Sequence, residues 1–263
     1  MKDNRNVLLV LLPFWTPMIP PLGITGLKSF LQSHGFPVKT CDANIENDYK
    51  EIYHRYFSCL GDHVPEEKKG NYFSIGTDVL RNHLMAHINY TNKEKYIELV
   101  KILIARTYYI EASETLVHRL IHIVEDFYRW LESYMLNLLE KEKPGVLGLS
   151  VYKDILPAAL YAFRLTREKY PYIKTVIGGA VFSEQLTIDS PDLEFFLEKT
   201  RDYIDKIIIG QGEFLFLEYL QGKLPETLRL HTAKDDNKRQ LDLSQLPVPD
   251  YSDIEMERYP YLG

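Results

Sequence analysis

Four short apolar runs constrain what this chain can fold into. They occupy residues 6–12, 145–150, 174–179 and 205–210, are rich in aliphatic residues, and are nearly continuous rather than alternating. A run of this kind is typical of a strand that is covered on both faces. A weaker run at residues 36–42 follows the first one along the chain.

Helical patterns separate these runs. Apolar residues recur at three- and four-residue spacing in residues 22–31, 158–165 and 214–220. Because strands and helices alternate, the sequence predicts an α/β fold whose core is a five-stranded, doubly wound parallel sheet with right-handed crossovers.

One interval breaks the alternation. Residues 45–143 separate the second and third expected strands by far more than a crossover helix requires, and their apolar residues have helical spacing up to Pro144. We therefore expect a large helical insertion within an α/β domain that spans residues 1–224. The polar and then proline-containing residues 225–263 are expected to form a linker.

Composition excludes several classes of protein. Hydrophobic residues make up 45% and charged residues 26% of the chain, which is ordinary for a globular domain, and the net charge of −6 predicts no nucleic-acid binding. Cys41 and Cys59, the only cysteines, cannot hold a cluster or a structural zinc by themselves. Pro13 cuts the apolar start, so we expect a strand there rather than a signal peptide or membrane span, and a cytoplasmic location.

The expected strand ends share a composition that suits a ligand. In open parallel sheets, ligands bind beyond the carboxyl ends of the strands. Gly178 and Gly179 follow one run, and Gly210 and Gly212 follow the next, so side chains are missing where a ligand would need space. The alternative is that each is only a turn glycine.

These strand ends also resemble a known family. The stretches "PPLG" (20–23), "CDAN" (41–44), "GLSVY" (148–152), "IGGAVF" (177–182), "GQGE" (210–213) and "LPVPD" (246–250) occur in the order and spacing of one domain type. Over residues 6–44 and 144–262 the chain resembles the amino-terminal cobalamin-binding domain of cobalamin-dependent radical SAM enzymes.

The resemblance implies a set of cofactor-binding residues. In that family the Gly-Gly turn and the serine after the third strand border the channel for the cobalamin nucleotide tail, and Gln211 stands where a glutamate is usual. Asp42 and Asn44 could equally cap a helix. The cobalamin-binding candidates are Trp15, Pro21, Leu22, Gly23, Asp42, Asn44, Ser150, Val151, Tyr152, Gly178, Gly179, Ala180, Gly210, Gln211, Gly212 and Glu213.

Two departures from related proteins refine this expectation. The loop at residues 13–23 contains no histidine to ligate cobalt from below, so the cobalamin is expected base-off without a protein imidazole. The cysteine motif of a radical SAM domain is also missing. The iron–sulfur cluster and S-adenosylmethionine are therefore expected in a domain beyond residue 263. The chain alone is expected to be inactive, as a module that serves methyl transfer or radical chemistry on a small-molecule or peptide substrate.

Other interpretations remain open at this stage. A degenerate module could have lost cobalamin and serve as a scaffold or substrate-docking domain, and a flavodoxin-like domain could bind a nucleotide with the same strand ends. The pairs His83/His87 and His118/His122 have a spacing that can hold a metal, but neither has the general base of an H-E-x-x-H motif. We expect no metal site and assign no catalytic residue.

Overall fold

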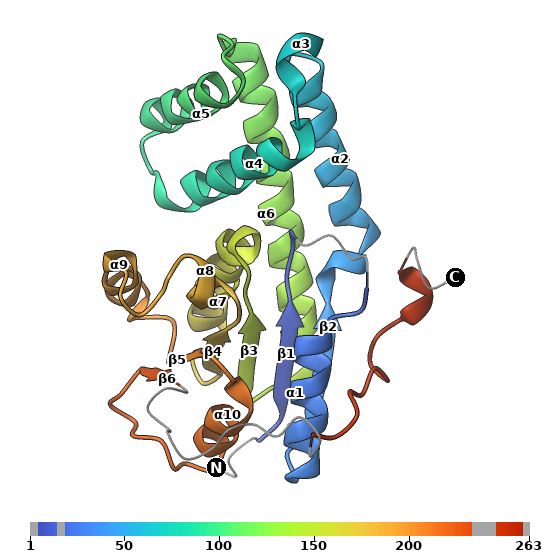
Figure 1. Cartoon of the computed structure of the whole chain (residues 1–263), viewed down its shortest axis with the longest axis vertical. Helices are drawn as coiled ribbons and strands as arrows, with labels where there is room; N and C mark the ends of the chain where they lie inside the picture. The colour runs from blue at the N-terminus through green and yellow to red at the C-terminus, as the bar shows by residue number, and fades with distance from the viewer. Residues whose placement is uncertain (1–4, 15–18, 233–245, 260–263) are drawn as a thin grey trace. The chain divides into compact units, whose positions relative to one another are not determined.

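The computed structural model describes residues 5–14, 19–232 and 246–259. The chain divides into two compact units (Figure 1). An α/β unit comprises Met1–Ile45 and Asn137–Gly263, and a helical unit comprises Glu46–Leu136. The helical unit falls within the interval that the sequence analysis assigns to an insertion.

A parallel sheet of six strands forms the centre of the α/β unit. The strand order is β2-β1-β3-β4-β5-β6, and every neighbouring pair is parallel. The order reverses between β1 and β3, because β2 lies on one side of β1 and all later strands lie on the other. The strands are β1 (Val7–Leu11), β2 (Val38–Asp42), β3 (Val146–Ser150), β4 (Lys174–Gly178), β5 (Lys206–Ile209) and β6 (Leu230–Thr232).

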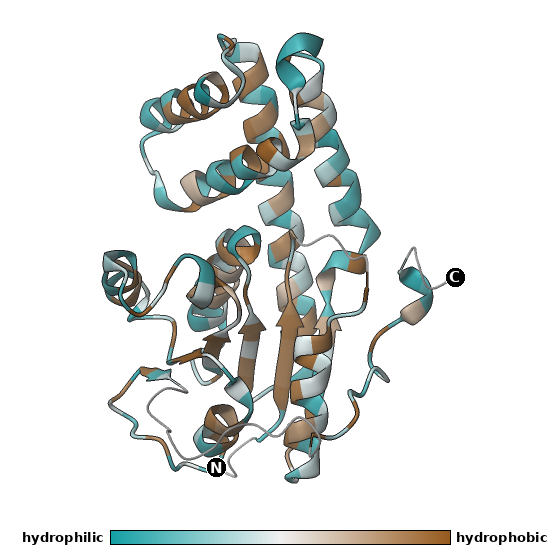
Figure 2. Cartoon of the chain, viewed as in Figure 1, coloured by the Kyte–Doolittle hydropathy of each residue, from teal (hydrophilic) through white to brown (hydrophobic). Residues whose placement is uncertain are grey.

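Burial explains why four runs are continuous and one is weaker. All residues of β1 and β5 are buried, and Figure 2 shows β1 as hydrophobic along its length. Strand β2 lies at an edge of the sheet, where Lys39 is exposed and Cys41 is partly exposed. An edge strand with one solvated side alternates, which is the weaker signal in the sequence.

The expected count of five strands was wrong, because β6 lies in the segment interpreted as a linker. It has no apolar run. Instead, the Lys206 ammonium group donates hydrogen bonds to the carbonyl oxygens of Pro225, Glu226 and Leu228, just before β6. Arg229 donates to the carbonyls of Leu197 and Ile204. Polar side chains therefore hold this edge in place.

Helices cover both faces of the sheet. In Figure 1, α1 and α10 lie in front of the sheet and α7 lies behind it. The Phe30 ring of α1 meets the Phe214 ring of α10 edge to face, with centroids 5.4 Å apart. The helices of this unit are α1 (Leu22–Ser33), α7 (Leu156–Lys169), α8 (Val181–Glu184), α9 (Pro191–Thr200) and α10 (Gly212–Leu220).

A buried lysine anchors the segment 246–259 to the α/β unit. The Lys28 side chain of α1 is 2% exposed, and its ammonium group lies 2.8 Å from a carboxylate oxygen of Asp250 and 2.7 Å from one of Asp253. Tyr259 donates a hydrogen bond of 2.6 Å to Asp42, at the end of β2. The "LPVPD" stretch thus ends at Asp250, whose carboxylate pairs with Lys28 of α1.

The same contacts keep both carboxylates ionised. The hydrogen bond from Lys28, together with those from Ser252, lowers the pKa of Asp250 to about 2. Burial acts to raise the pKa of Asp253, but hydrogen bonds from Lys28, Thr40 and Lys39 outweigh it and lower the pKa overall. A carboxyl group with a depressed pKa stabilises the fold at every pH above its ordinary, unfolded-state pKa. This stabilisation is lost as the pH falls towards 2.

The helical unit is built from α2 (Asn47–Gly61), α3 (Glu66–Lys69), α4 (Tyr72–Asn89), α5 (Lys93–Tyr108) and most of α6 (Glu114–Glu142). None of the helices in the described part of the chain has both the length and the apolar character that crossing a membrane requires.

His83 of α4 is completely buried in this unit. Its Nδ1 atom lies 3.0 Å from the Tyr56 hydroxyl, and its Nε2 atom has no partner among the described residues. Burial, with a smaller contribution from His87, lowers the pKa of His83 to about 3. In the folded state this imidazole is therefore neutral throughout the range in which a free histidine gains its proton.

We expect mildly acidic pH to destabilise the helical unit through His83. The unfolded chain binds a proton below its ordinary pKa of about 6.5 and the folded chain does not, so the free energy of unfolding should fall by about 2 kcal/mol between pH 7 and pH 5. The substitution His83→Asn keeps a group that can bond to Tyr56 but removes the titration. Urea unfolding at both pH values should show a smaller pH dependence in His83→Asn than in the parent; equal dependence would contradict the assignment.

Removing the Lys28 ammonium group should release the segment 246–259. The substitution Lys28→Met leaves the carboxylate of Asp253, which is 13% exposed, without its buried cation. We expect a loss of about 3 kcal/mol in the free energy of unfolding and faster hydrogen exchange in the segment. The control is Lys39→Met, since Lys39 is 61% exposed and pairs with the same carboxylate. Its cost should stay below about 1 kcal/mol, and equal costs for the two variants would argue against the anchor.

Candidate functional site

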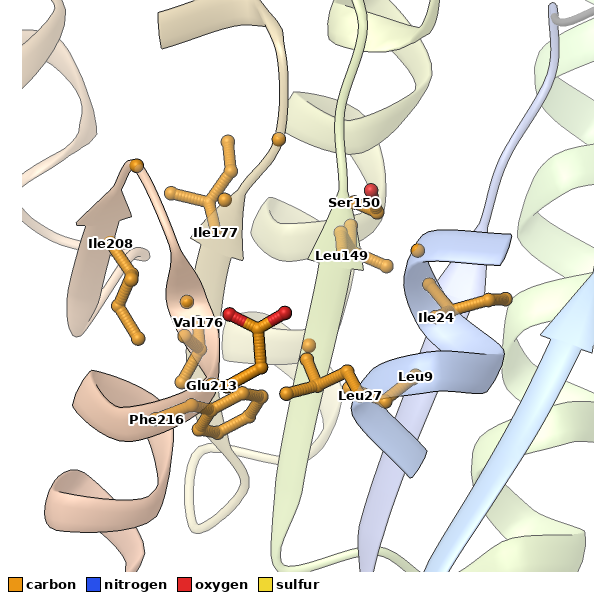
Figure 3. A pocket seen from close by; sticks show the side chains of 16 residues that line it. Leu9, Ile24, Leu27, Leu149, Ser150, Val176, Ile177, Ile208, Glu213 and Phe216 are labelled. Atoms are coloured by element: carbon orange, nitrogen blue, oxygen red, sulfur yellow. The ribbon is translucent and has the colours of Figure 1, made fainter. Parts of the chain in front are cut away.

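A cavity of about 150 Å³ opens at the carboxyl ends of the strands (Figure 3). Residues of β1, β3, β4 and β5 form its floor, and the first turns of α1 and α10 form its walls. This is the side of the sheet at which ligands bind in open parallel folds, next to the reversal of strand order. The position follows from the topology rather than from any single motif.

Several residues that the sequence predicts for cofactor binding meet at this cavity. They come from separate strand ends and from the starts of both helices. These lining residues are Gly23, Ser150, Gly178, Gly179, Gly210, Gly212 and Glu213.

Six other candidates are neighbours of lining residues in the sequence but do not line the cavity themselves. Pro21 precedes α1, Leu22 begins α1, and Tyr152, Ala180 and Gln211 occupy the cap positions before a 3₁₀ turn, α8 and α10. Val151 is completely buried, and its peptide group bonds to Gly178 and Val181. Trp15 lies outside the described residues.

Asp42 and Asn44 lie apart from the residues that line the cavity. Asn44 donates two hydrogen bonds to one oxygen of Asp42, from its amide nitrogen (2.8 Å) and its backbone nitrogen (2.9 Å). The other oxygen of Asp42 accepts from Tyr259. Both side chains are buried, so their polar groups are satisfied inside the protein. Capping of α2 does not involve them either, since its cap residue is Glu46.

Gly178, the last residue of β4, and Gly179, which follows it, differ in why glycine suits the position. Gly179 has φ = +112°, and a Cβ atom there would lie 2.5 Å from the backbone nitrogen and oxygen of Val151. The protein itself therefore requires glycine at this position, whether or not a ligand is present. At Gly178 the nearest atom to an added Cβ would be the Ile208 carbonyl oxygen, at 3.3 Å.

Gly23 is a lining glycine that the surrounding protein does not explain. A Cβ atom at this position would meet no atom within 4 Å, and no positive φ is recorded for it. Glycine in a helix costs stability relative to alanine. The missing side chain leaves open space at the cavity, where it lies on the same side of α1 as Ile24 and Leu27.

Sequence reasoning missed the apolar walls. Ile24 and Leu27 on α1 and Phe216 on α10 face the cavity together with Leu9 and Ile208 from the sheet. The available signal was spacing, because Phe216 follows Glu213 by three residues and Leu27 follows Ile24 by three, which places each pair on one helical face.

Among the described residues that line the cavity, Glu213 is the single charged one. It belongs to the first turn of α10, where a carboxylate is favoured by the helix dipole. Its Oε2 atom is enclosed by protein and has no hydrogen-bond partner among the described residues. In Figure 3 the carboxylate lies between Val176 and Leu27, within the apolar lining.

The histidine pairs have other contacts. His83 bonds to Tyr56, the His87 ring stacks on Tyr128, and His122 lies 3.0 Å from a carboxylate oxygen of Glu125. Within the described ranges, no group of three or more His, Cys, Asp or Glu side chains is placed to hold a metal ion.

We expect Gly179→Ala to destabilise the α/β unit even without a ligand. The added Cβ would collide with the Val151 backbone at an unfavourable φ, which should cost about 2 kcal/mol or more of the free energy of unfolding. Gly23→Ala provides the control, because its Cβ enters open space and alanine is the better helix former, so stability should stay the same or rise by up to about 1 kcal/mol. Chemical denaturation of both variants checks this, and a harmless Gly179→Ala would show that the turn can rearrange.

Comparisons with family models, with curated proteins and with solved structures found no match to this chain.

Proposed function

We propose that the α/β unit is a cofactor-binding module, and that its cofactor is cobalamin. The observation that carries the proposal is the cavity itself, which joins apolar walls, strand-end glycines and an enclosed carboxylate at the ligand-binding edge of the sheet. Gly23 adds support, since a Cβ atom there would have no atom of the described residues within 4 Å.

The size and lining of the cavity support one part of this cofactor. An apolar cavity of about 150 Å³ accepts a single small aromatic molecule, so the base of the nucleotide tail is the part of cobalamin that suits it. Ser150, Gly178 and Glu213 would surround the base, with Leu27 and Phe216 against its faces. The sequence resemblance places the tail at the same strand ends.

A nucleotide held by its phosphates, as in a flavodoxin-like module, suits this cavity less well. No lysine or arginine of the described residues lines it, and the carboxylate of Glu213 occupies the first turn of α10, where a phosphate would otherwise accept backbone hydrogen bonds. Like charges would oppose each other there.

When bound, cobalamin would supply a cobalt centre for methyl transfer or radical chemistry with a cluster and S-adenosylmethionine on a separate radical SAM domain. The residues of this chain would bind and orient the cofactor and exclude water from its tail. The region of residues 13–23 offers no imidazole for the cobalt, so the proposal includes a base-off state.

Retention of hydroxocobalamin tests the proposal. The parent protein is incubated with hydroxocobalamin, desalted, and its visible spectrum recorded. We expect the parent and Gly26→Leu to retain the corrin absorbance and Gly23→Leu to lose at least about tenfold in affinity, because only Gly23 lines the cavity while both glycines have open space around the added Cβ.

Thermal unfolding of both variants serves as the control for folding. If the parent protein loses the corrin on desalting, the cobalamin proposal is wrong and a scaffold or docking module is favoured. Equal retention by Gly23→Leu and Gly26→Leu would show that the cofactor lies elsewhere.

A further inference from the structure

One oxygen of the Glu213 carboxylate is in an unfavourable environment, although Glu213 as a whole is partly exposed. Its neighbours in the cavity are apolar side chains and glycines, with the hydroxyl of Ser150 as the other polar side chain of the lining. The Oε2 atom is enclosed, and no described residue donates to it. A buried acceptor without a donor destabilises a protein, because the water that it loses on folding is not replaced.

The helix dipole explains why a carboxylate is tolerated in this turn, but it does not explain the direction of the side chain. An acidic residue in the first turn of a helix gains the same stabilisation when it points to solvent. In Figure 3 the Glu213 carboxylate instead lies among Leu27, Leu149 and Val176. A group that enters the cavity and donates a hydrogen bond would supply the missing partner.

We propose that the cavity selects flat nitrogen heterocycles that present an N–H group to Glu213. This inference rests on the proposed function for the location of the ligand and adds its chemical class. The apolar walls suit the faces of a ring, and the enclosed oxygen accepts only from a donor at the ring edge. A phosphate or carboxylate in this position is disfavoured by like charge, and no lysine or arginine in the part of the chain that the structure describes lines the cavity to offset it.

The benzimidazole of cobalamin belongs to this class when its free ring nitrogen carries a proton. Contact with the carboxylate favours that protonated form, and a protonated nitrogen cannot ligate cobalt. Glu213 would in this way hold the detached base in the cavity as well as recognise it.

Indole and benzofuran test the inference directly. The two molecules have nearly the same shape, but indole presents an N–H group where benzofuran has an oxygen atom. Ligand-detected NMR titrations of the full chain should show indole binding about tenfold more tightly than benzofuran, as expected for a hydrogen bond to a charged acceptor. In Glu213→Met the ratio should fall to about one, and in Glu213→Gln it should lie between.

Stability separates recognition from a structural role. Without a ligand, Glu213→Met should unfold at the same temperature as the parent or at a higher one, because the substitution removes an unpartnered polar group. A clear loss of stability would show that Glu213 serves the fold and would overturn the proposal. So would equal binding of the two probes by the parent, a preference that persists in Glu213→Met, or binding of neither probe.

The outcomes also distinguish this inference from the proposed function. If hydroxocobalamin is retained while indole and benzofuran bind alike, cobalamin binding stands and the role of Glu213 fails. If indole is preferred while hydroxocobalamin is not retained, the heterocycle site stands and the cofactor assignment fails.

Discussion

The pairing of β1 along both of its edges is the constraint on which the site depends. Strand β1 is fully buried, so its peptide groups cannot bond to water and must be satisfied by neighbouring strands. Val7 is in register with Val38 of β2 on one side and with Val146 of β3 on the other. This double pairing sets β3 beside β1 across a long interval of sequence, and the cavity opens where the carboxyl ends of β3 and β4 lie next to β1.

Helix α1 contributes to both the cavity and the C-terminal segment. Gly23, Ile24 and Leu27 line the cavity, while Lys28, the next residue, points elsewhere and pairs with Asp250 and Asp253. One residue along the helix turns the side chain by about 100° around the axis, so Lys28 is directed away from Leu27 and towards the segment 246–259.

The sequence predicts those features that depend on local pattern. Strands β1, β3, β4 and β5 are predictable because burial on both faces makes their sequences continuously apolar, and the position of Glu213 follows from its place after β5. Strand β6 was not predictable, since the polar contacts of Lys206 and Arg229 hold it. The structural role of Asp42 was not predictable either, because its partner Tyr259 lies 217 residues away along the chain.

The contrast between Gly179 and Gly23 bears on how such modules diverge. Gly179 is required by the Val151 backbone, so a descendant that no longer bound any ligand would still have to keep it. Gly23 meets no such requirement, and a descendant of that kind could exchange it for any good helix former. The Gly-Gly turn at the end of the fourth strand would therefore persist with the scaffold, whereas glycine at position 23 would persist only where the open space at the cavity is needed.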